Sequence, residues 1–181
     1  MDPALIDSDD PTPALGLVVD EERGALPYQL VHGESLVACA AWALGRSGVD
    51  LVDASVQWPG LVDAGEDVVL HDALCPMTPP EFIADCLAAA RSTGRPVVGV
   101  DAAGTVLSPV VLPAQVVVAW THELPRLPAT DLARLVGLLE ASYDVQRRVA
   151  PAAAARVTSA DDIAALERLT GPDADAAAED A

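Results

Sequence analysis

The chain of 181 residues contains no lysine, and its ten basic residues are all arginines. Against them stand 28 acidic residues, which give a formal net charge of −18. A surface this acidic repels nucleic acids and anionic lipids, so the charge argues against a nucleic-acid-binding or membrane-surface protein. It also disfavours ligands with several phosphates unless a local basic patch opposes the overall charge.

Cysteine is scarce, and its pattern argues against a small domain stabilised by disulfides or by zinc. Cys39, Cys75 and Cys86 cannot all pair, and no two of them form a CxxC motif. Neither a disulfide framework nor a zinc site is therefore supported. Cys39 and Cys86 lie within apolar helical patterns, where cysteine behaves as a small core residue.

Long apolar runs are also missing, although 51% of the residues are hydrophobic. Asp, Gly or Pro interrupts each run well before the ~20 residues that a membrane helix needs. The first residues, Met1-Asp2-Pro3, are acidic where a secretory signal would be basic. We therefore expect a cytoplasmic protein with no membrane span.

The acidic residues divide the chain into a body and two tails. Residues 1–13 and 171–181 carry eight of the 28 acids among many Pro and Ala residues, and this composition predicts disorder. The body, residues 14–170, keeps 20 acidic and 10 basic residues. Its length and apolar content predict one globular domain.

Within the body, strand-like and helix-like segments alternate. Residues 113–121 fit a short helix that begins after a proline, although three consecutive valines also suit a strand. Trp58-Pro59-Gly60 indicates a turn. The alternation predicts an α/β fold, with a mostly parallel sheet covered by helices on both faces. The predicted strands are 14–20, 49–56, 67–71, 96–101, 105–111 and 144–149, and the predicted helices are 35–47, 79–91, 113–121, 131–141 and 160–169.

The most informative stretch is residues 68–81. Residues 68–70 are three consecutive apolar residues, and this pattern predicts a buried strand. His71 and Asp72 follow them, so we expect both side chains at the rim of the sheet, where open α/β folds keep ligand sites. A helix follows, with Thr78 expected as N-cap, Pro79 at its first position and Glu81 completing a capping box.

Three segments together resemble 2-C-methyl-D-erythritol 4-phosphate cytidylyltransferases. Residues 69–83, VLHDALCPMTPPEFI, resemble the family's "HDAARP" segment and the helix after it. Residues 156–166, RVTSADDIAAL, are similar to its closing "KVTTPEDL" segment, and residues 26–30 with the helix after Glu34 are similar to its "PKQ" turn. The matches occur in the family's order and cover roughly residues 14–170.

The resemblance implies a three-layer, Rossmann-like nucleotidyltransferase fold and a reaction of CTP with a sugar-alcohol phosphate. It implies Asp72 as the carboxylate that holds Mg²⁺, with Asp72 and Arg156 as catalytic residues. Arg23, Gly24 and Thr158 correspond to positions that would bind the nucleotide or a substrate phosphate.

The sequence departs from the family where the triphosphate must lie. The loop 20–28, DEERGALPY, begins with three acids and has Tyr28 in place of a lysine, and Cys75 replaces the arginine of the central motif. The base-reading segment and the dimerisation arm are missing as well. Losing aimed cations lowers transition-state stabilisation. We therefore expect weakened or lost catalysis, weak binding of CTP or another nucleotide, and a binding or regulatory role.

Two other functions stay open. The chain could be an active nucleotidyltransferase that uses Asp72, Arg23 and Arg156 on an altered substrate. It could also be a protein whose acidic tails bind a basic protein partner. Without the arm, we expect a monomer or a dimer through another surface.

Single residues keep alternatives too. Asp72 could be satisfied by a backbone donor, and Arg156 could pair with an acid rather than a phosphate. His71 is either structural or a general base, and Cys75 is either a reactive thiol or a filler of the space that arginine leaves.

Overall fold

A computed structural model describes residues 13–53, 55–120 and 131–172. The predicted tails at 1–13 and 171–181 fall almost entirely outside the described residues. Among the described helices, none has both the length and the apolar character needed to cross a membrane.

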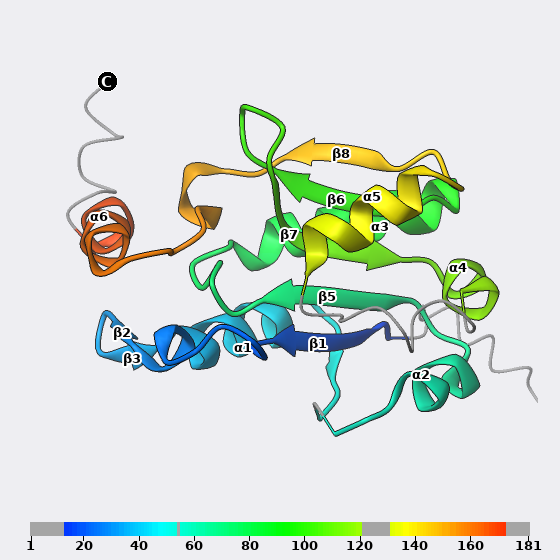
Figure 1. Ribbon diagram of the computed structural model, residues 1–181, viewed down its shortest axis with the longest axis horizontal. Coiled ribbons are helices and arrows are strands. Elements are labelled where there is room, and N and C mark those ends of the chain that lie inside the picture. The colour runs from blue at the N-terminus through cyan, green and yellow to red at the C-terminus, as the bar shows by residue number, and fades with distance from the viewer. Residues whose placement is uncertain (1–12, 54, 121–130, 173–181) are drawn as a thin grey trace, which may run out of the picture.

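A six-stranded sheet forms the centre of the molecule, in the order β4-β1-β5-β7-β6-β8 (Figure 1). Strand β7 runs antiparallel to β5 and β6, while the other neighbouring strands are parallel. A separate hairpin consists of two short strands, β2 and β3. The strands are β1 (Leu15–Val19), β2 (Leu30–Val31), β3 (Glu34–Ser35), β4 (Asp50–Leu51), β5 (Val68–Asp72), β6 (Val97–Val100), β7 (Val106–Leu112) and β8 (Gln146–Val149).

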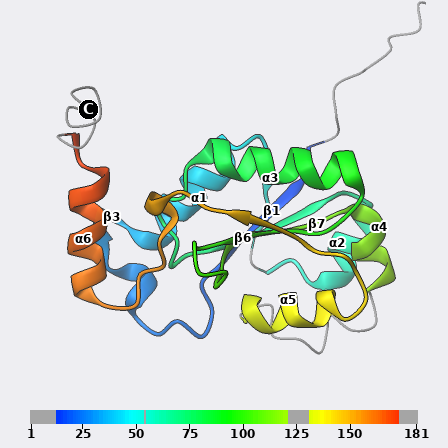
Figure 2. The same cartoon turned by 90° about the horizontal axis from the view of Figure 1, so that it is seen from above.

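Helices cover both faces of the sheet, as Figure 2 shows: α1 and α3 lie on one side, and α5, with α2 and α4 at one end, on the other. Helix α6 stands apart at the opposite end, beside the β2–β3 hairpin. The helices are α1 (Leu36–Arg46), α2 (Trp58–Ala64), α3 (Pro80–Thr93), α4 (Ala114–Ala119), α5 (Leu132–Glu140) and α6 (Ala160–Thr170), with 3-10 turns at Leu26–Tyr28 and Ala152–Ala154.

Strand β5 is buried along its whole length, because its successive side chains enter the cores on opposite faces of the sheet. Val69 packs with Leu44 of α1 and Ile83 of α3. Leu70 packs on the other face, in the cluster that contains Leu135 of α5. A third cluster joins α6 to the hairpin and to the loop after β5. The predicted three-layer α/β architecture is confirmed.

Three local predictions were wrong. Trp58-Pro59-Gly60 is the first turn of α2, where proline is accepted because the first N–H groups of a helix have no partner within it. Only Asp50 and Leu51 of the predicted strand 49–56 pair with the sheet. Thr78 does not cap α3, which begins after Pro79; its hydroxyl instead donates to the Cys75 carbonyl at 2.8 Å.

Other helix boundaries lie within two residues of those predicted. Ser35 caps α1 and Ser159 caps α6 with their side-chain oxygens, and Gly94 ends α3 with φ +67°. Residues 114–119 are helical, which decides between the two alternatives for that segment. Helix α5 begins one residue later than predicted, because Asp131 is its N-cap: the Asp131 carboxylate accepts from the Arg134 N–H at 2.9 Å.

Candidate functional site

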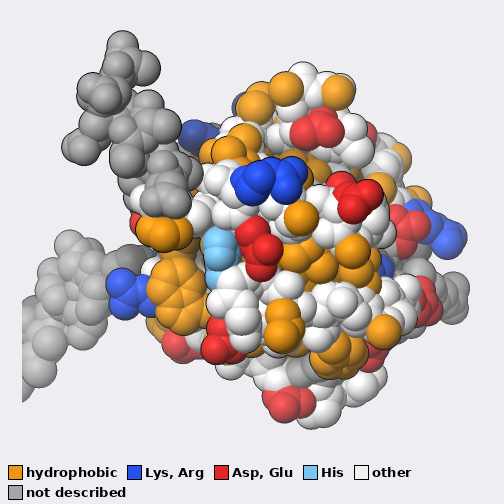
Figure 3. Space-filling model, turned by 90° about the vertical axis from the view of Figure 1, so that its left-hand side faces the viewer, with side chains coloured by type: hydrophobic (Ala, Val, Ile, Leu, Met, Phe, Trp, Pro, Cys, Tyr) orange, Lys and Arg blue, Asp and Glu red, His pale blue; other side chains and the backbone are white. Residues whose placement is uncertain are grey.

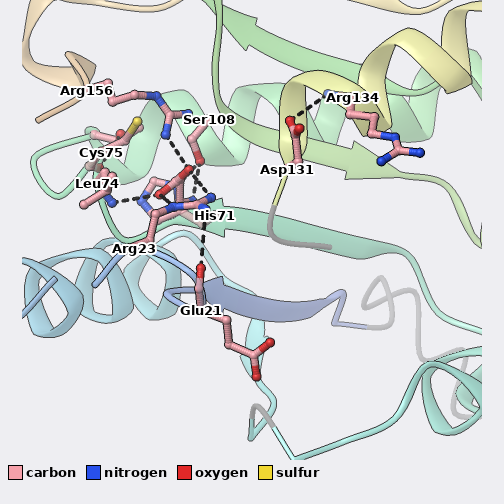
Figure 4. Close-up of polar contacts among 11 residues, drawn as sticks. Glu21, Arg23, His71, Leu74, Cys75, Ser108, Asp131, Arg134 and Arg156 are labelled. Carbon is pink, nitrogen blue, oxygen red and sulfur yellow. Dashed lines mark hydrogen bonds and ion pairs between the residues drawn. The ribbon is translucent and has the colours of Figure 1, made fainter. Parts of the chain in front are cut away.

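The site lies where the parallel strands β1 and β5 end together. Val19 of β1 is paired with Asp72 of β5, so the loop that follows β1 passes directly beside the loop that follows β5. This register brings Arg23 next to Asp72. The segment before α6 brings Arg156 to the same point, as Figure 4 shows.

Both carboxylate oxygens of Asp72 are bound by guanidinium groups. Arg23 donates from Nε to Oδ1 at 3.3 Å and from Nη2 to Oδ2 at 2.9 Å. Arg156 donates from Nη1 to Oδ2 at 2.6 Å, and the Leu74 N–H donates to Oδ1 at 2.9 Å. The Asp72 side chain is fully buried, whereas those of Arg23 and Arg156 are 14% and 27% exposed.

This arrangement keeps Asp72 ionised. Burial alone would raise the pKa of its carboxyl group, but hydrogen bonds from Arg23, the charge of Arg156 and the Leu74 N–H together hold that pKa below its ordinary value. A buried carboxylate needs such partners, because an unpaired charge in the interior is costly. The cluster of Arg23, Asp72 and Arg156, here called the arginine–aspartate cluster, therefore binds the two loops together.

His71 and Ser108 lie beneath this cluster and are completely buried. The Ser108 hydroxyl oxygen lies 2.5 Å from Nδ1 of His71 and accepts from the Asp72 N–H at 2.9 Å. Burial lowers the pKa of His71 to about 4, although the charge of Asp72 opposes the shift. His71 is thus a neutral side chain between β5 and β7 with no solvent contact, which fits the structural role rather than that of a general base.

Cys75 is also completely buried, and burial raises the pKa of its thiol to about 12. A thiol without access or thiolate character is not a nucleophile at neutral pH. Of the two alternatives for Cys75, the structure supports a buried residue that fills space in the interior rather than a reactive thiol.

A cavity of about 480 Å³ opens above the arginine–aspartate cluster. Arg23, Asp72 and Arg156 form part of its wall, and Glu22 and Asp131 add two carboxylates. Figure 3 looks onto this end of the molecule, where basic and acidic side chains lie side by side. The wall is therefore mixed in charge rather than uniformly positive.

The other residues that the resemblance singled out are not among the residues of the cavity wall. Gly24 occupies an exposed turn with φ +61°. Thr158 donates from its N–H and from its hydroxyl to Oδ2 of Asp162, at 2.8 and 2.6 Å, in the first turn of α6. Tyr28 is 64% exposed. The structure thus unites Arg23, Asp72 and Arg156, and it leaves Gly24 and Thr158 outside this group.

The residues present do not fit a Mg²⁺ ion. Magnesium in nucleotide sites takes oxygen ligands from one or two carboxylates together with substrate phosphates. Here both oxygens of Asp72 already accept from positively charged groups. Within the described part of the chain, no group of three or more His, Cys, Asp or Glu side chains is placed to hold a metal.

Two site residues were not found from the sequence. Ser108 lies within an apolar strand, and only the register between β5 and β7 brings it to His71. Asp131 was predicted to lie in a helix, but nothing in the sequence placed that helix at the cavity. Its position directly before the apolar residues of a helix is typical of an N-cap and gives no indication of a ligand site.

Comparison with known proteins identifies the fold. No protein-family model matches the chain, and no curated protein matches it by sequence. The solved structures similar to it include the following three, two of them from Thermus thermophilus and Mycobacterium tuberculosis. They are a 2-C-methyl-D-erythritol 4-phosphate cytidylyltransferase (T. thermophilus; TM-score 0.61, 19% identity, 87% of this chain and 98% of that chain), Rv0371c in complex with manganese (M. tuberculosis; TM-score 0.62, 15% identity, 87% and 99%) and a CMP:2-keto-3-deoxy-manno-octonic acid synthetase complexed with CTP (TM-score 0.60, 10% identity, 89% and 99%).

These similarities extend over nearly the whole length of the solved chains, at identities too low to carry more than the architecture. What the chain shares with these structures is the architecture: a mostly parallel sheet with one antiparallel strand and helices on both faces. The chain therefore has the nucleotidyltransferase fold of the 2-C-methyl-D-erythritol 4-phosphate cytidylyltransferases.

Proposed function

We propose that this protein is a nucleotidyltransferase-fold protein with weakened or lost catalysis, kept for a binding or regulatory role. The observation that carries the proposal is that both carboxylate oxygens of Asp72 are bound by Arg23 and Arg156. The two arginines that would attract a triphosphate already neutralise a buried carboxylate. The carboxylate that would hold a metal has no free oxygen.

The electrostatics of the cavity support the same proposal. A transferring phosphoryl group needs cations aimed at the charge that develops on it. Here Glu22 and Asp131 line the cavity together with the arginines, so added carboxylates oppose the charge that a triphosphate would bring. The consecutive acids Asp20, Glu21 and Glu22 repel phosphate from the loop after β1 as well.

The test is a titration of the protein with CTP and Mg²⁺ in a calorimeter, combined with a pyrophosphate-release assay on 2-C-methyl-D-erythritol 4-phosphate. We expect no pyrophosphate release and only weak CTP binding. Micromolar affinity for CTP together with formation of a CDP-alcohol would contradict the proposal. An active cytidylyltransferase assayed in parallel shows that the substrates and the metal are competent.

A second candidate is an active nucleotidyltransferase with an altered substrate. It is favoured by the position of the cavity, at the carboxyl ends of parallel strands where open α/β folds bind ligands. On this view Asp72→Asn abolishes turnover of the true substrate in a protein that is still folded by circular dichroism. Turnover that is unchanged in Asp72→Asn would exclude it.

Three further expectations concern the cellular location, the partner and the oligomeric state of the protein. A cytoplasmic location, a basic protein partner of the acidic tails, and a monomer or a dimer through another surface are predictions. Light scattering on the purified protein measures the oligomeric state. Deletion of residues 1–13 and 171–181, followed by co-purification from native cells, tests the role of the tails.

A further inference from the structure

A second and larger cavity, of about 620 Å³, lies on the other side of the loop that joins β5 to α3. Leu74 faces the cavity above the arginine–aspartate cluster, whereas Met77 and Pro79 line this second one. Its remaining walls come from α1 and from the β2–β3 hairpin. We call it the α1 groove, and its size falls within the range of small-molecule sites.

The floor and walls of the α1 groove are mainly apolar. Its apolar lining includes Cys39 and Trp42 of α1 and Met77 and Pro79 of the loop. Trp42 is 63% exposed, which is unusual for the largest apolar side chain and marks a surface suited to a ligand. On the end of the molecule that Figure 3 shows, hydrophobic side chains gather beside a histidine and acidic side chains.

The polar groups of the groove differ in whether they already have partners. His32 is held by α6, through its N–H to Glu167 at 2.9 Å and its ring Nε2 to the Thr170 hydroxyl at 2.7 Å. Thr78 donates to the Cys75 carbonyl. Within the described residues, the Glu34 carboxylate has no hydrogen bond or ion pair, and it lies close enough to Cys39 for its charge to help raise the pKa of that thiol, after burial.

We propose that the α1 groove binds a small molecule with an apolar body and a cationic amine head, with Glu34 as the partner of the amine. Charge complementarity selects this class: Glu34 supplies the carboxylate of the wall, no arginine is among the described residues of the wall, and the whole chain has a formal net charge of −18. Arg46 lies outside the wall and places its guanidinium 5.9 Å from the centre of the Trp42 ring. The indole of Trp42 therefore already makes a cation–π contact. The proposal does not depend on the fate of the arginine–aspartate cluster.

Three probes that share one apolar body test the head group: 4-phenylbutylamine, 4-phenylbutanol and 4-phenylbutyrate. Trp42 is the most exposed of the three tryptophans, since Trp120 is 8% exposed and Trp58 is half-buried, so tryptophan fluorescence follows occupancy of the groove. We expect the amine to bind about fivefold tighter than the alcohol, as one partly exposed ion pair provides, and the carboxylate to bind more weakly than both.

Cys39 gives a second readout. It is the one cysteine of the three that is not fully buried, so N-ethylmaleimide reaches it before Cys75 and Cys86. Saturating amine should slow its alkylation severalfold, as measured by mass spectrometry. An alkylation rate that does not change at saturation would overturn the proposal.

Variants separate the head group from the body of the ligand. Glu34→Gln should remove the preference for the amine and leave binding of the alcohol unchanged. Asp63→Asn removes one charge from exposed α2, at the opposite end of the molecule in Figure 1, and should retain the preference. Ala38→Phe, on the exposed wall of α1, should weaken all three probes. Equal binding of the three probes, or a preference that survives in Glu34→Gln, would contradict the inference.

Discussion

Arg23 donates hydrogen bonds to both carboxylate oxygens of Asp72, although the two residues lie 49 positions apart in the chain. Arg156 reaches the same carboxylate from 84 positions away. Three segments that are distant in sequence thus depend on one buried charge. The stability of this end of the molecule should therefore respond strongly to any change in that charge.

Asp72→Asn should lower the free energy of unfolding by about 3 kcal/mol, because it leaves two partly buried guanidinium groups without their counter-ion. Urea denaturation followed by circular dichroism measures the change. Asp144→Asn is the matched control, since its ion pair with Arg95 is exposed and contributes less than about 1 kcal/mol. Equal effects of the two substitutions would show that Asp72 is not held as described.

The double variant Arg23→Gln with Arg156→Gln should lose more stability than the two single variants together. Either single substitution also removes the repulsion between the two guanidinium groups, whereas the double substitution leaves the Asp72 carboxylate buried without a cation. We expect a coupling free energy of about 1 kcal/mol from urea denaturation of the four proteins. Strict additivity would indicate that the two arginines act independently.

His71 should make the protein less stable as the pH falls from about 6.5 to about 4. Its pKa is lowered to about 4 in the folded chain from an ordinary 6.5, so within this window the unfolded chain binds a proton that the folded chain excludes. The loss amounts to about 3 kcal/mol by pH 4 and levels off below that pH, where the folded chain binds the proton as well.

Urea denaturation at a series of pH values measures the loss due to His71, and His71→Gln should flatten the curve. Asp72 does not produce this slope. Because its pKa lies below the ordinary carboxyl value, its contribution is lost only at lower pH, as the pH falls through its own pKa. A flat profile in the wild-type protein from pH 6.5 to 4 would count against a neutral buried His71.

Gly99→Ala should destabilise the protein by about 3 kcal/mol, because the added Cβ would lie 2.4 Å from the backbone oxygen of Ser108, which cannot move away as a side chain can. The shift would also disturb the bonds of Ser108 to His71 and Asp72. Gly137→Ala is the control: its Cβ meets nothing within 4 Å, and alanine favours the helix that contains it. Thermal denaturation should show opposite shifts for the two variants.

Much of the fold followed from local signals. The strand observed at 68–72 was predicted at 67–71, because a short apolar run bounded by polar residues suits a buried strand. The helix after Ser35 was predicted from the spacing of its apolar residues, and the helix after Ser159 from its cap. The predictions of a turn at Pro59 and of an N-cap at Thr78 were wrong because each residue is compatible with two local structures. Packing of α2 and the turn at Cys75 decided between them.

The candidate site was only partly predictable. Asp72, Arg23 and Arg156 were selected as single residues by their positions in a resemblance, but their bonds to one another were not. Asp72 had two open alternatives, a metal and a backbone donor. The structure gives it the Leu74 N–H and, in addition, two guanidinium groups, since the register of β1 on β5 brings the two loops into contact.

The sequence by itself determined the α/β class, the acidic surface and the three consecutive acids in the loop after β1, because composition and periodicity are properties of near neighbours in the chain. Only the tertiary structure decided that the remaining arginines neutralise Asp72 and that an unpaired Glu34 borders an apolar groove within the described residues. The physical reason is that charge pairing depends on distance in space. That distance is set by strand register and loop packing, which no local pattern specifies.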